Sequence, residues 1–270
     1  MPELPEVETI KNDLLPWVKG HRFSQVAILD ARIIARGSVE DFCQGLIGQT
    51  VTALDRRGKY LLFHLSDNKC LIIHLRMTGV LLLDSGNSGR YTRAVFHFSN
   101  GRRIVFNDRR RLGLMWLSNS ADPTISKLGP EPLSEDFTPE MLSKRLANHQ
   151  IPIKAALTDQ SIIAGIGNMY ADEALFGAGI HPLKRANSLS STEIYTLFRW
   201  IQRTLQAAIQ SQGASVNTYL RPDGQQGTAH FQFRVAHRGG EPCSVCSTPI
   251  ERIEVRGRGT YFCPKCQRLG

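Results

Sequence analysis

The chain has 270 residues, 41% of them hydrophobic, which is enough for two or three domains with apolar cores. Its 33 Lys and Arg outnumber 24 Asp and Glu, and the net charge of +9 suits an acidic polymer such as nucleic acid or a membrane surface. No apolar run approaches the ~20 residues of a bilayer span, and the N-terminus lacks the layout of a signal peptide. We therefore expect a soluble cytosolic protein and regard membrane binding as the weaker explanation of the charge.

The first six residues allow two interpretations. Removal of Met1 would turn Pro2 into a secondary amine, and a free α-amino group with a pKa of about 7.7–8.0 is partly neutral near neutral pH. Such an amine can attack an electrophilic carbon and form a Schiff base, with Glu3 and Glu6 nearby for proton transfer. The residues also fit an ordinary helix start, with Pro5 in the first helical position. Taken alone, the hexapeptide favours the helix start.

The first half of the chain changes from a helical pattern to a β pattern. Four apolar residues near the N-terminus recur at spacings of three to four: Val7, Ile10, Leu14 and Val18. They predict a helix that Pro16 ends or kinks. From about Phe23 to Leu117, short β-rich runs alternate with turn signals such as Ser99-Asn100-Gly101. This series is typical of an antiparallel sandwich.

The second half reads as helical after a linker at Gly129–Leu133, and the helical spacing continues to about Gln212. Gly165 and Gly167 separate two helical segments there. Backbone amides at the start of the second segment, next to Asn168, could bind a phosphate. An ordinary helical hairpin fits these residues equally well.

Four of the six cysteines form two CxxC pairs, and these are Cys243, Cys246, Cys263 and Cys266. Their spacing is typical of a four-thiolate zinc site, and a reducing compartment argues against disulfides. Strands are expected at Ile250–Arg256 and Thr260–Phe262, with Arg256–Gly259 as the turn between them. Cys43 and Cys70 lie in apolar surroundings, so we expect them to be buried and inert.

Six motifs, taken in order along the chain, resemble the bacterial formamidopyrimidine-DNA glycosylase family, whose members excise oxidised purines. They are Met1–Thr9, Arg57–Leu61, His74–Gly79, Leu128–Leu133, Gly165–Asn168 with Tyr170–Glu173, and the zinc module with Gly257–Thr260. The resemblance implies an α+β fold in three parts. These are an N-terminal antiparallel β-sandwich with flanking helices (1–128), a helical helix-two-turns-helix domain (129–225) and a C-terminal zinc-finger β-hairpin (234–270) that holds one Zn²⁺.

The resemblance also implies roles for individual residues. Pro2 would be the nucleophile that attacks C1′ of the damaged nucleotide, and Glu3 the acid–base residue that assists opening of the sugar ring. Lys59 would contact phosphate and take part in β-elimination, and Arg258 would grip phosphate and take part in δ-elimination. The residues expected to bind DNA are Glu6, His74, Met77, Tyr91, Arg110, Leu112 and Asn168.

Three of these residues fall at the family's positions that fill the gap left by a flipped nucleotide, and we call Met77, Arg110 and Leu112 the gap-filling residues. An enzyme that works on a base must take the base out of the stack, so something must replace it. Arg110 would face the orphaned cytosine, because a guanidinium has only donors and fits an acceptor edge.

Each of these roles has a structural alternative. Met77 could be ordinary hydrophobic filler, and Arg110 one more solvated member of the Arg109–Arg111 cluster. Lys59 could be a solvated charge and His74 a satisfied core histidine.

The sequence departs from the family pattern at four positions. Leu112 stands where phenylalanine is common, and Tyr91 where many members have a DNA-contacting histidine. Asn217 and Ala236 differ from residues seen near the base-recognition loop in some members. Lesion preference is therefore the least transferable part of the resemblance.

The leading hypothesis is a bifunctional base excision repair enzyme. It would remove oxidised purines (8-oxoguanine and formamidopyrimidines) from double-stranded DNA through a Pro2 Schiff base, cleave the strand by β,δ-elimination, and act as a monomer. The sister endonuclease VIII group shares Pro2 and Glu3 but prefers oxidised pyrimidines, and Leu4 with the Met77–Arg110 arrangement favours the purine enzyme. A non-catalytic zinc-dependent DNA-binding protein would need Asn168 and Arg258 but no free proline amine.

Overall fold

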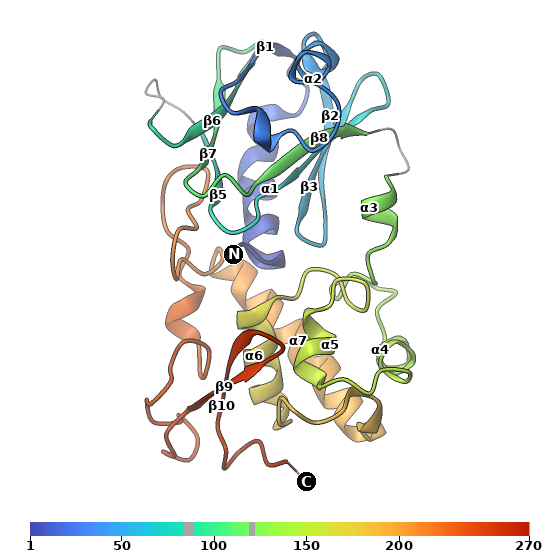
Figure 1. Cartoon of the computed structure of the whole chain (residues 1–270), viewed down its shortest axis with the longest axis vertical. Coiled ribbons are helices and arrows are strands. Elements are labelled where there is room, and N and C mark those ends of the chain that lie inside the picture. Colours follow the sequence, from blue (N-terminus) through green and yellow to red (C-terminus); the bar gives the residue numbers. More distant parts are fainter. Residues whose placement is uncertain (84–88, 119–121, 270) are drawn as a thin grey trace. The chain divides into compact units, whose positions relative to one another are not determined.

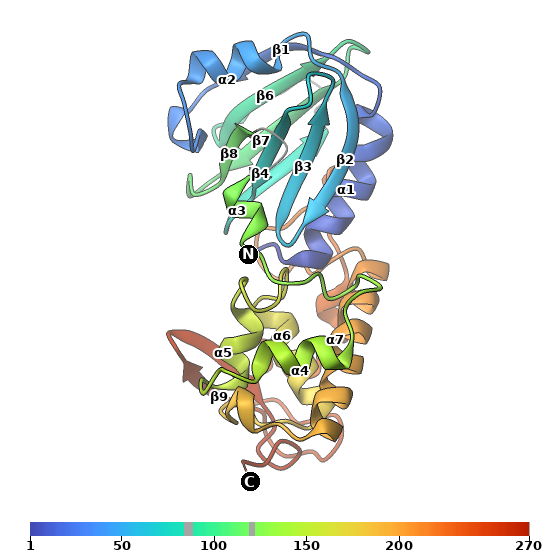
Figure 2. The same ribbon diagram turned by 90° about the vertical axis from the view of Figure 1, so that its right-hand side faces the viewer.

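The computed structural model describes residues 1–83, 89–118 and 122–269. It divides into two compact units, which are shown in Figures 1 and 2. The first unit comprises residues 1–126 and 211–230, and the second comprises residues 127–210 and 231–270. The expected boundaries of three parts, at 1–128, 129–225 and 234–270, stay predictions. By packing, residues 211–230 belong to the first unit.

Helix α1 (Leu4–Val18) opens the first unit, and its polar start is capped. Glu3 is the N-cap, and its backbone N–H donates to the Glu6 carboxylate at 2.7 Å. Pro5 is the second residue of the helix, one position later than expected. Its missing N–H costs nothing there, because the backbone N–H groups of the first turn have no partner inside the helix. Pro16 does not end the helix, which continues to Val18. The four predicted apolar residues are fully buried, so the predicted helix face is confirmed.

Two four-stranded antiparallel sheets form the body of the first unit (Figure 2). One sheet has the order β1 (Phe23–Ile28), β6 (Thr92–Phe98), β7 (Arg103–Asp108) and β5 (Gly79–Leu83). The other has the order β2 (Val51–Arg57), β3 (Tyr60–Leu65), β4 (Cys70–His74) and β8 (Leu114–Ser118). Side chains of both sheets and of α1 share one apolar core, so the predicted sandwich is confirmed. Short helical segments flank it: η1 (Ala31–Ile33), α2 (Val39–Leu46) and α3 (Pro123–Ser126).

The second unit is helical and ends in a small β-hairpin. Its elements are α4 (Pro139–Leu146), α5 (Ile153–Thr158), α6 (Asn168–Ala178), η2 (Ala186–Ser188), α7 (Ser191–Gln210), η3 (Ala229–Gln232, which begins in the first unit), β9 (Glu251–Val255) and β10 (Arg258–Phe262). Helices α6 and α7 pack closely at Gly177, where a Cβ atom would come within 2.3 Å of the Trp200 ring. No helix among the described residues is long and apolar enough to cross a bilayer.

The turn of the C-terminal hairpin is shorter than expected. It consists of Arg256 and Gly257, which both have positive φ (48° and 75°), as a two-residue turn with matching strand twist requires. Arg258 was expected in this turn, but it is the first residue of β10 and pairs with Val255. The two positive φ angles close the chain within two residues, so pairing resumes at Arg258.

Candidate active site and DNA-binding surfaces

The N-terminus of the first unit is anchored through Glu6. One oxygen of its buried carboxylate accepts the Glu3 N–H, and the other accepts the Ala214 N–H at 2.8 Å. Ala214 belongs to the 211–230 segment, which approaches closely because Gly213 (φ +80°) leaves room for the Glu6 side chain. Pro2 and Glu3 are both buried beside this contact. Its carboxylate thus fixes the start of α1, and the contact with DNA expected for Glu6 stays a prediction.

Lys59 and His74 lie together at one end of the second sheet. Lys59 is buried in the two-residue turn between β2 and β3, which Gly58 opens in the left-handed region (φ +56°). The next residue, Tyr60, pairs with His74, and their ring centroids are 4.5 Å apart. Burial, with the nearby charges of Arg76 and Lys59, lowers the pKa of His74 to about 3.

The tautomer of His74 follows from its hydrogen bond. The Arg76 backbone N–H donates to His74 Nδ1 at 3.1 Å. A neutral imidazole that accepts at Nδ1 carries its proton on Nε2. Nε2–H is therefore a neutral donor of the kind that can bind a phosphate oxygen.

We expect the buried neutral His74 to make stability depend on pH. The unfolded chain binds a proton at His74 below pH 6.5, whereas the folded chain does so only near pH 3, so stability is lost as pH falls below 6.5. The contribution of His74 to the slope of the free energy of unfolding against pH should be about 1.4 kcal/mol per pH unit. Urea unfolding measured between pH 7 and 4 should show a free energy of unfolding that depends less steeply on pH in His74→Gln than in wild type. Parallel curves for wild type and His74→Gln would contradict this reading.

The three gap-filling residues project from two connected loops. Met77 is 44% and Leu112 40% exposed, and Arg110 is also exposed. The loops touch where the Arg110 backbone N–H donates to Thr78 Oγ1 at 3.1 Å. Exposed apolar side chains held on a fixed loop pair differ from ordinary core filler.

Tyr91 packs among arginines. Arg90 and Arg109 both lie over its ring, at 5.0 and 5.8 Å from the centroid. Its expected contact with DNA stays a prediction.

In the second unit, Asn168 is hydrogen-bonded to the zinc hairpin, which is the pair of strands β9 and β10. Asn168 is the first residue of α6, and its Nδ2 donates to the Gly259 carbonyl at 2.7 Å. Its buried Oδ1 has no hydrogen-bond partner among the described residues. Arg258 is exposed and directly precedes Gly259, so the hydrogen bond to Gly259 brings Asn168 close to Arg258.

A buried ion pair that the sequence analysis missed supports this place. Lys154 binds the Asn168 carbonyl at 2.6 Å and the Asp172 carboxylate, with both side chains 1% exposed. Burial raises the pKa of Asp172 to about 7, opposed by the Lys154 charge. Lys154, Arg256 and Arg258 line a cavity of about 350 Å³. The sequence signal for this pair was Lys154, the one charged residue of α5.

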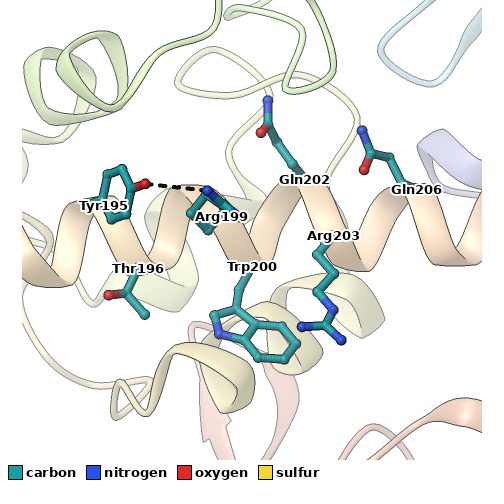
Figure 3. A pocket seen from close by; sticks show the side chains of 7 residues that line it. All are labelled: Tyr195, Thr196, Arg199, Trp200, Gln202, Arg203 and Gln206. Atoms are coloured by element: carbon teal, nitrogen blue, oxygen red, sulfur yellow. Dashed lines mark hydrogen bonds between the residues drawn. The ribbon is translucent and has the colours of Figure 1, made fainter.

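A second cavity, of about 680 Å³, runs along α7 and contains none of the predicted site residues (Figure 3). Arg199 donates to the Tyr195 hydroxyl there at 3.4 Å, and Arg203 lies over the Trp200 ring at 4.9 Å.

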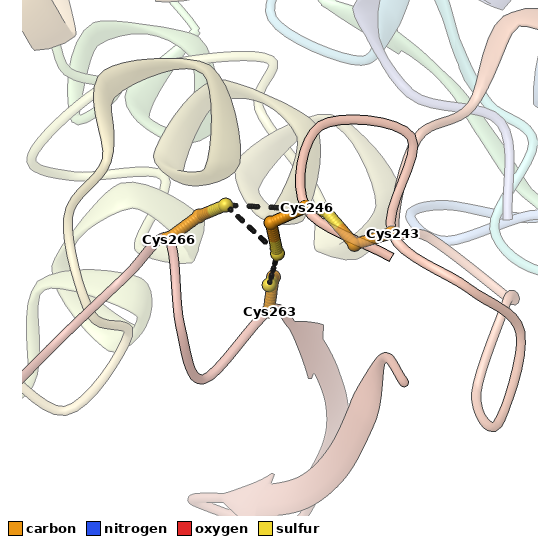
Figure 4. A group of neighbouring side chains, drawn as sticks. All are labelled: Cys243, Cys246, Cys263 and Cys266. Atoms are coloured by element: carbon orange, nitrogen blue, oxygen red, sulfur yellow. Dashed lines mark hydrogen bonds between the residues drawn. The ribbon is translucent and has the colours of Figure 1, made fainter. Parts of the chain in front are cut away.

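The four CxxC thiols converge as a zinc site requires (Figure 4). Their sulfur atoms all lie within 4.8 Å, with separations of 3.4 Å for Cys246–Cys263, 3.5 Å for Cys246–Cys266 and 3.9 Å for Cys243–Cys266. A tetrahedron with Zn–S bonds of about 2.3 Å has edges of about 3.8 Å. The donor set therefore fits one Zn²⁺.

The two remaining cysteines lie in the first unit. Cys70 is buried as expected, and burial raises the pKa of its thiol to about 12. Cys43 is only half-buried, but burial raises its pKa as well. Both thiols thus stay protonated and unreactive.

The fold and site define a class: a zinc-finger protein that joins a β-sandwich to a helical unit with clustered cationic groups. Three family models refine it. The formamidopyrimidine-DNA glycosylase N-terminal domain matches residues 1–115, the formamidopyrimidine-DNA glycosylase H2TH domain matches residues 128–219, and the zinc finger found in FPG and IleRS matches residues 240–269. The chain belongs to the formamidopyrimidine-DNA glycosylase family. The family, fold class and zinc cofactor predicted from sequence are confirmed.

Individual relatives resemble the chain over nearly its whole length. A formamidopyrimidine-DNA glycosylase of Geobacillus kaustophilus is 44% identical and covers 99% of this chain and 100% of its own. The structure of the MutM (FPG) protein from Thermus thermophilus is 39% identical with a TM-score of 0.91, covering 100% of both chains. A mutant of Lactococcus lactis FPG in complex with a Fapy-dG containing DNA is 34% identical with a TM-score of 0.92, covering 99% and 100%.

Proposed function

We propose that this protein is a base excision repair glycosylase and AP lyase that removes oxidised purines from duplex DNA. The observation that carries the proposal is the anchored N-terminus. The Glu6 carboxylate accepts from both the Ala214 N–H and the N–H of Glu3, the N-cap residue that follows Pro2. A helix start needs no such contact with a distant segment, whereas a nucleophile needs a fixed position. The Fapy-dG containing DNA bound by the L. lactis relative supports the substrate class.

The proposed reaction begins when Met1 is removed and the Pro2 amine attacks C1′ of the damaged nucleotide. The C1′–N bond breaks, and the base leaves with its electron pair and takes up the proton that the Pro2 nitrogen loses. Glu3 then protonates the ring oxygen O4′, so the C1′–O4′ bond breaks, the sugar ring opens and an iminium ion forms between C1′ and Pro2. The iminium ion formed with Pro2 is an electron sink and makes the C2′ proton acidic. Loss of that proton expels the 3′-phosphate, and a second elimination releases the 5′ side.

The remaining predicted residues would hold the DNA during these steps. Lys59 and the neutral His74 Nε2–H would bind phosphates near the reacting nucleotide, and Lys59 would also assist β-elimination. In the second unit, Asn168 and Arg258 would bind phosphate, and Arg258 would assist δ-elimination. Zn²⁺ supplies no chemistry in this scheme, and its four thiolates hold the hairpin that carries Arg258.

The proposal is tested by incubating wild-type protein with three duplexes that carry 8-oxoguanine opposite cytosine, thymine glycol, or no lesion. Each duplex is used in two parallel reactions, one with borohydride to trap the covalent intermediate and one without it to follow excision and strand cleavage. We expect a covalent protein–DNA adduct and faster excision of 8-oxoguanine than of thymine glycol. Strand products should end in phosphate on both sides of the gap, since both eliminations are proposed. Faster excision of thymine glycol would favour the endonuclease VIII group. Absence of any adduct would favour a non-catalytic DNA-binding protein.

A further inference from the structure

Asp108 lies at the base of the two loops that carry the gap-filling residues, and it is fully buried. It is the last residue of β7, and it pairs with Gly79, the first residue of β5. The loop that carries Met77 enters β5, and the loop that carries Arg110 and Leu112 leaves β7. Both loops therefore start from the same end of one sheet, on either side of Asp108.

The Asp108 carboxylate is hydrogen-bonded to both loops. Its Oδ1 accepts from the Thr78 hydroxyl and from the Arg110 N–H at 3.1 Å. Its Oδ2 accepts the N–H groups of Leu112 at 2.8 Å and Gly113 at 2.7 Å. Four donors thus converge on one buried carboxylate, and this number compensates its loss of hydration.

The surroundings leave the loop little freedom to take another conformation. Arg111, between the two gap-filling residues, has φ +59°, a left-handed conformation that a non-glycine residue adopts only when its neighbours hold it. A Cβ atom at Gly113 would come within 2.4 Å of the Phe106 ring. The Asp108 carbonyl accepts from Arg93 Nε at 3.0 Å, which fixes the backbone below the loop.

We propose that Asp108, acting with Thr78, is the positioning residue that holds Met77, Arg110 and Leu112 in the geometry that fills the gap left by the flipped nucleotide. This inference rests on the proposed function. Asp108 touches no substrate in this scheme and acts only through the two loops. An aspartate that only stabilised the end of the sheet would not need to accept hydrogen bonds from both of these loops.

The informative variant is Asp108→Asn, which keeps the shape of the side chain but replaces one acceptor oxygen by an NH₂ donor. In either orientation of the amide, this group would face a backbone N–H donor, from Arg110 on one side or from Leu112 and Gly113 on the other. The loop must then shift. A shift of about 1 Å at a positioning contact can cost roughly 100-fold in rate.

The test compares two substrates under single-turnover conditions. Excision from an 8-oxoguanine:cytosine duplex requires flipping of an intact paired base, whereas cleavage at a preformed abasic site does not. We expect Asp108→Asn to slow the first by roughly 100-fold and the second by less than about threefold. Wild type should act faster opposite cytosine than opposite adenine, because Arg110 would face the orphaned cytosine, and this preference should weaken in Asp108→Asn.

Two further variants separate positioning from folding. Thr78→Val removes the bridging hydroxyl and should change the same ratio in the same direction, so it replaces Asp108→Asn if that variant does not fold. Asp122→Asn is the matched control, since Asp122 is another buried carboxylate of the first unit that accepts from Trp116, Thr124 and Arg36 but holds no gap-filling residue. It should lower the melting temperature and leave the ratio and the opposite-base preference at wild-type values.

The outcomes keep the two proposals apart. An unchanged ratio and unchanged opposite-base preference in folded Asp108→Asn, or in Thr78→Val, would overturn the positioning role while leaving the glycosylase proposal intact. Wild-type protein that cleaves neither substrate would instead overturn the proposed function.

Discussion

Protein that retains Met1 should form no borohydride-trapped adduct with damaged DNA, and its excision and strand cleavage should both fall by at least about a thousandfold. The physical reason is that the Pro2 nitrogen then lies in a peptide bond, whose lone pair is delocalised and is a poor nucleophile. The sample can be made by expression with methionine aminopeptidase inhibited, and intact-mass analysis reports the state of Met1. Trapping and cleavage are then measured on an 8-oxoguanine duplex.

The same sample provides its own control. Treatment with methionine aminopeptidase should restore the adduct without any change in sequence, in proportion to the fraction of chains that lose Met1. Pro2→Gly should also lose the adduct, whereas Pro5→Ala, a proline replacement within the first turn of α1, should keep it. A trapped adduct of undiminished yield on fully Met1-retaining protein would show that another amine is the nucleophile.

Local patterns in the sequence predicted several elements correctly, although they missed the length of the turn between β9 and β10. The spacing of Val7, Ile10, Leu14 and Val18 predicted a helix face because 3.6 residues per turn bring those side chains together. The two CxxC pairs predicted the thiolate cluster because zinc accepts a narrow range of loop lengths. Alternating strands and turns were likewise enough to predict the sandwich.

Contacts between distant residues could not be predicted in this way. The hydrogen bond from Ala214 to Glu6 joins residues 208 positions apart. The sequence around Glu6 does not indicate that its carboxylate has a partner so far along the chain. Thr78 and Asp108 are 30 positions apart, although Asp108 was visible as the one acid in a run of arginines. Lys154 and Asp172 meet only because α5 and α6 pack together.

Loss of zinc should have the second largest effect. We expect Cys263→Ala to lose the bound metal, since Cys263 is fully buried at the centre of a small cluster with Phe176, Val235 and Ile250. A two-stranded hairpin is marginal in water by itself, and metal binding supplies its folding free energy. Without it, β10 no longer holds Arg258 or the Gly259 carbonyl that positions Asn168.

The expected consequence for DNA binding follows from those two contacts. A hydrogen bond to a charged group contributes about 1.5–3 kcal/mol. Loss of the Arg258–phosphate contact alone should therefore raise the Kd for DNA by roughly 10- to 150-fold. Elemental analysis should find about one zinc per wild-type chain and none in Cys263→Ala, with Kd measured at one fixed salt concentration. Cys70→Ala and Cys43→Ala replace thiols outside the cluster and should retain both metal and affinity. Full metal content in Cys263→Ala would contradict the four-thiolate assignment. Loss of metal with unchanged affinity for DNA would instead show that neither the β9–β10 hairpin nor its Arg258 contributes to DNA binding.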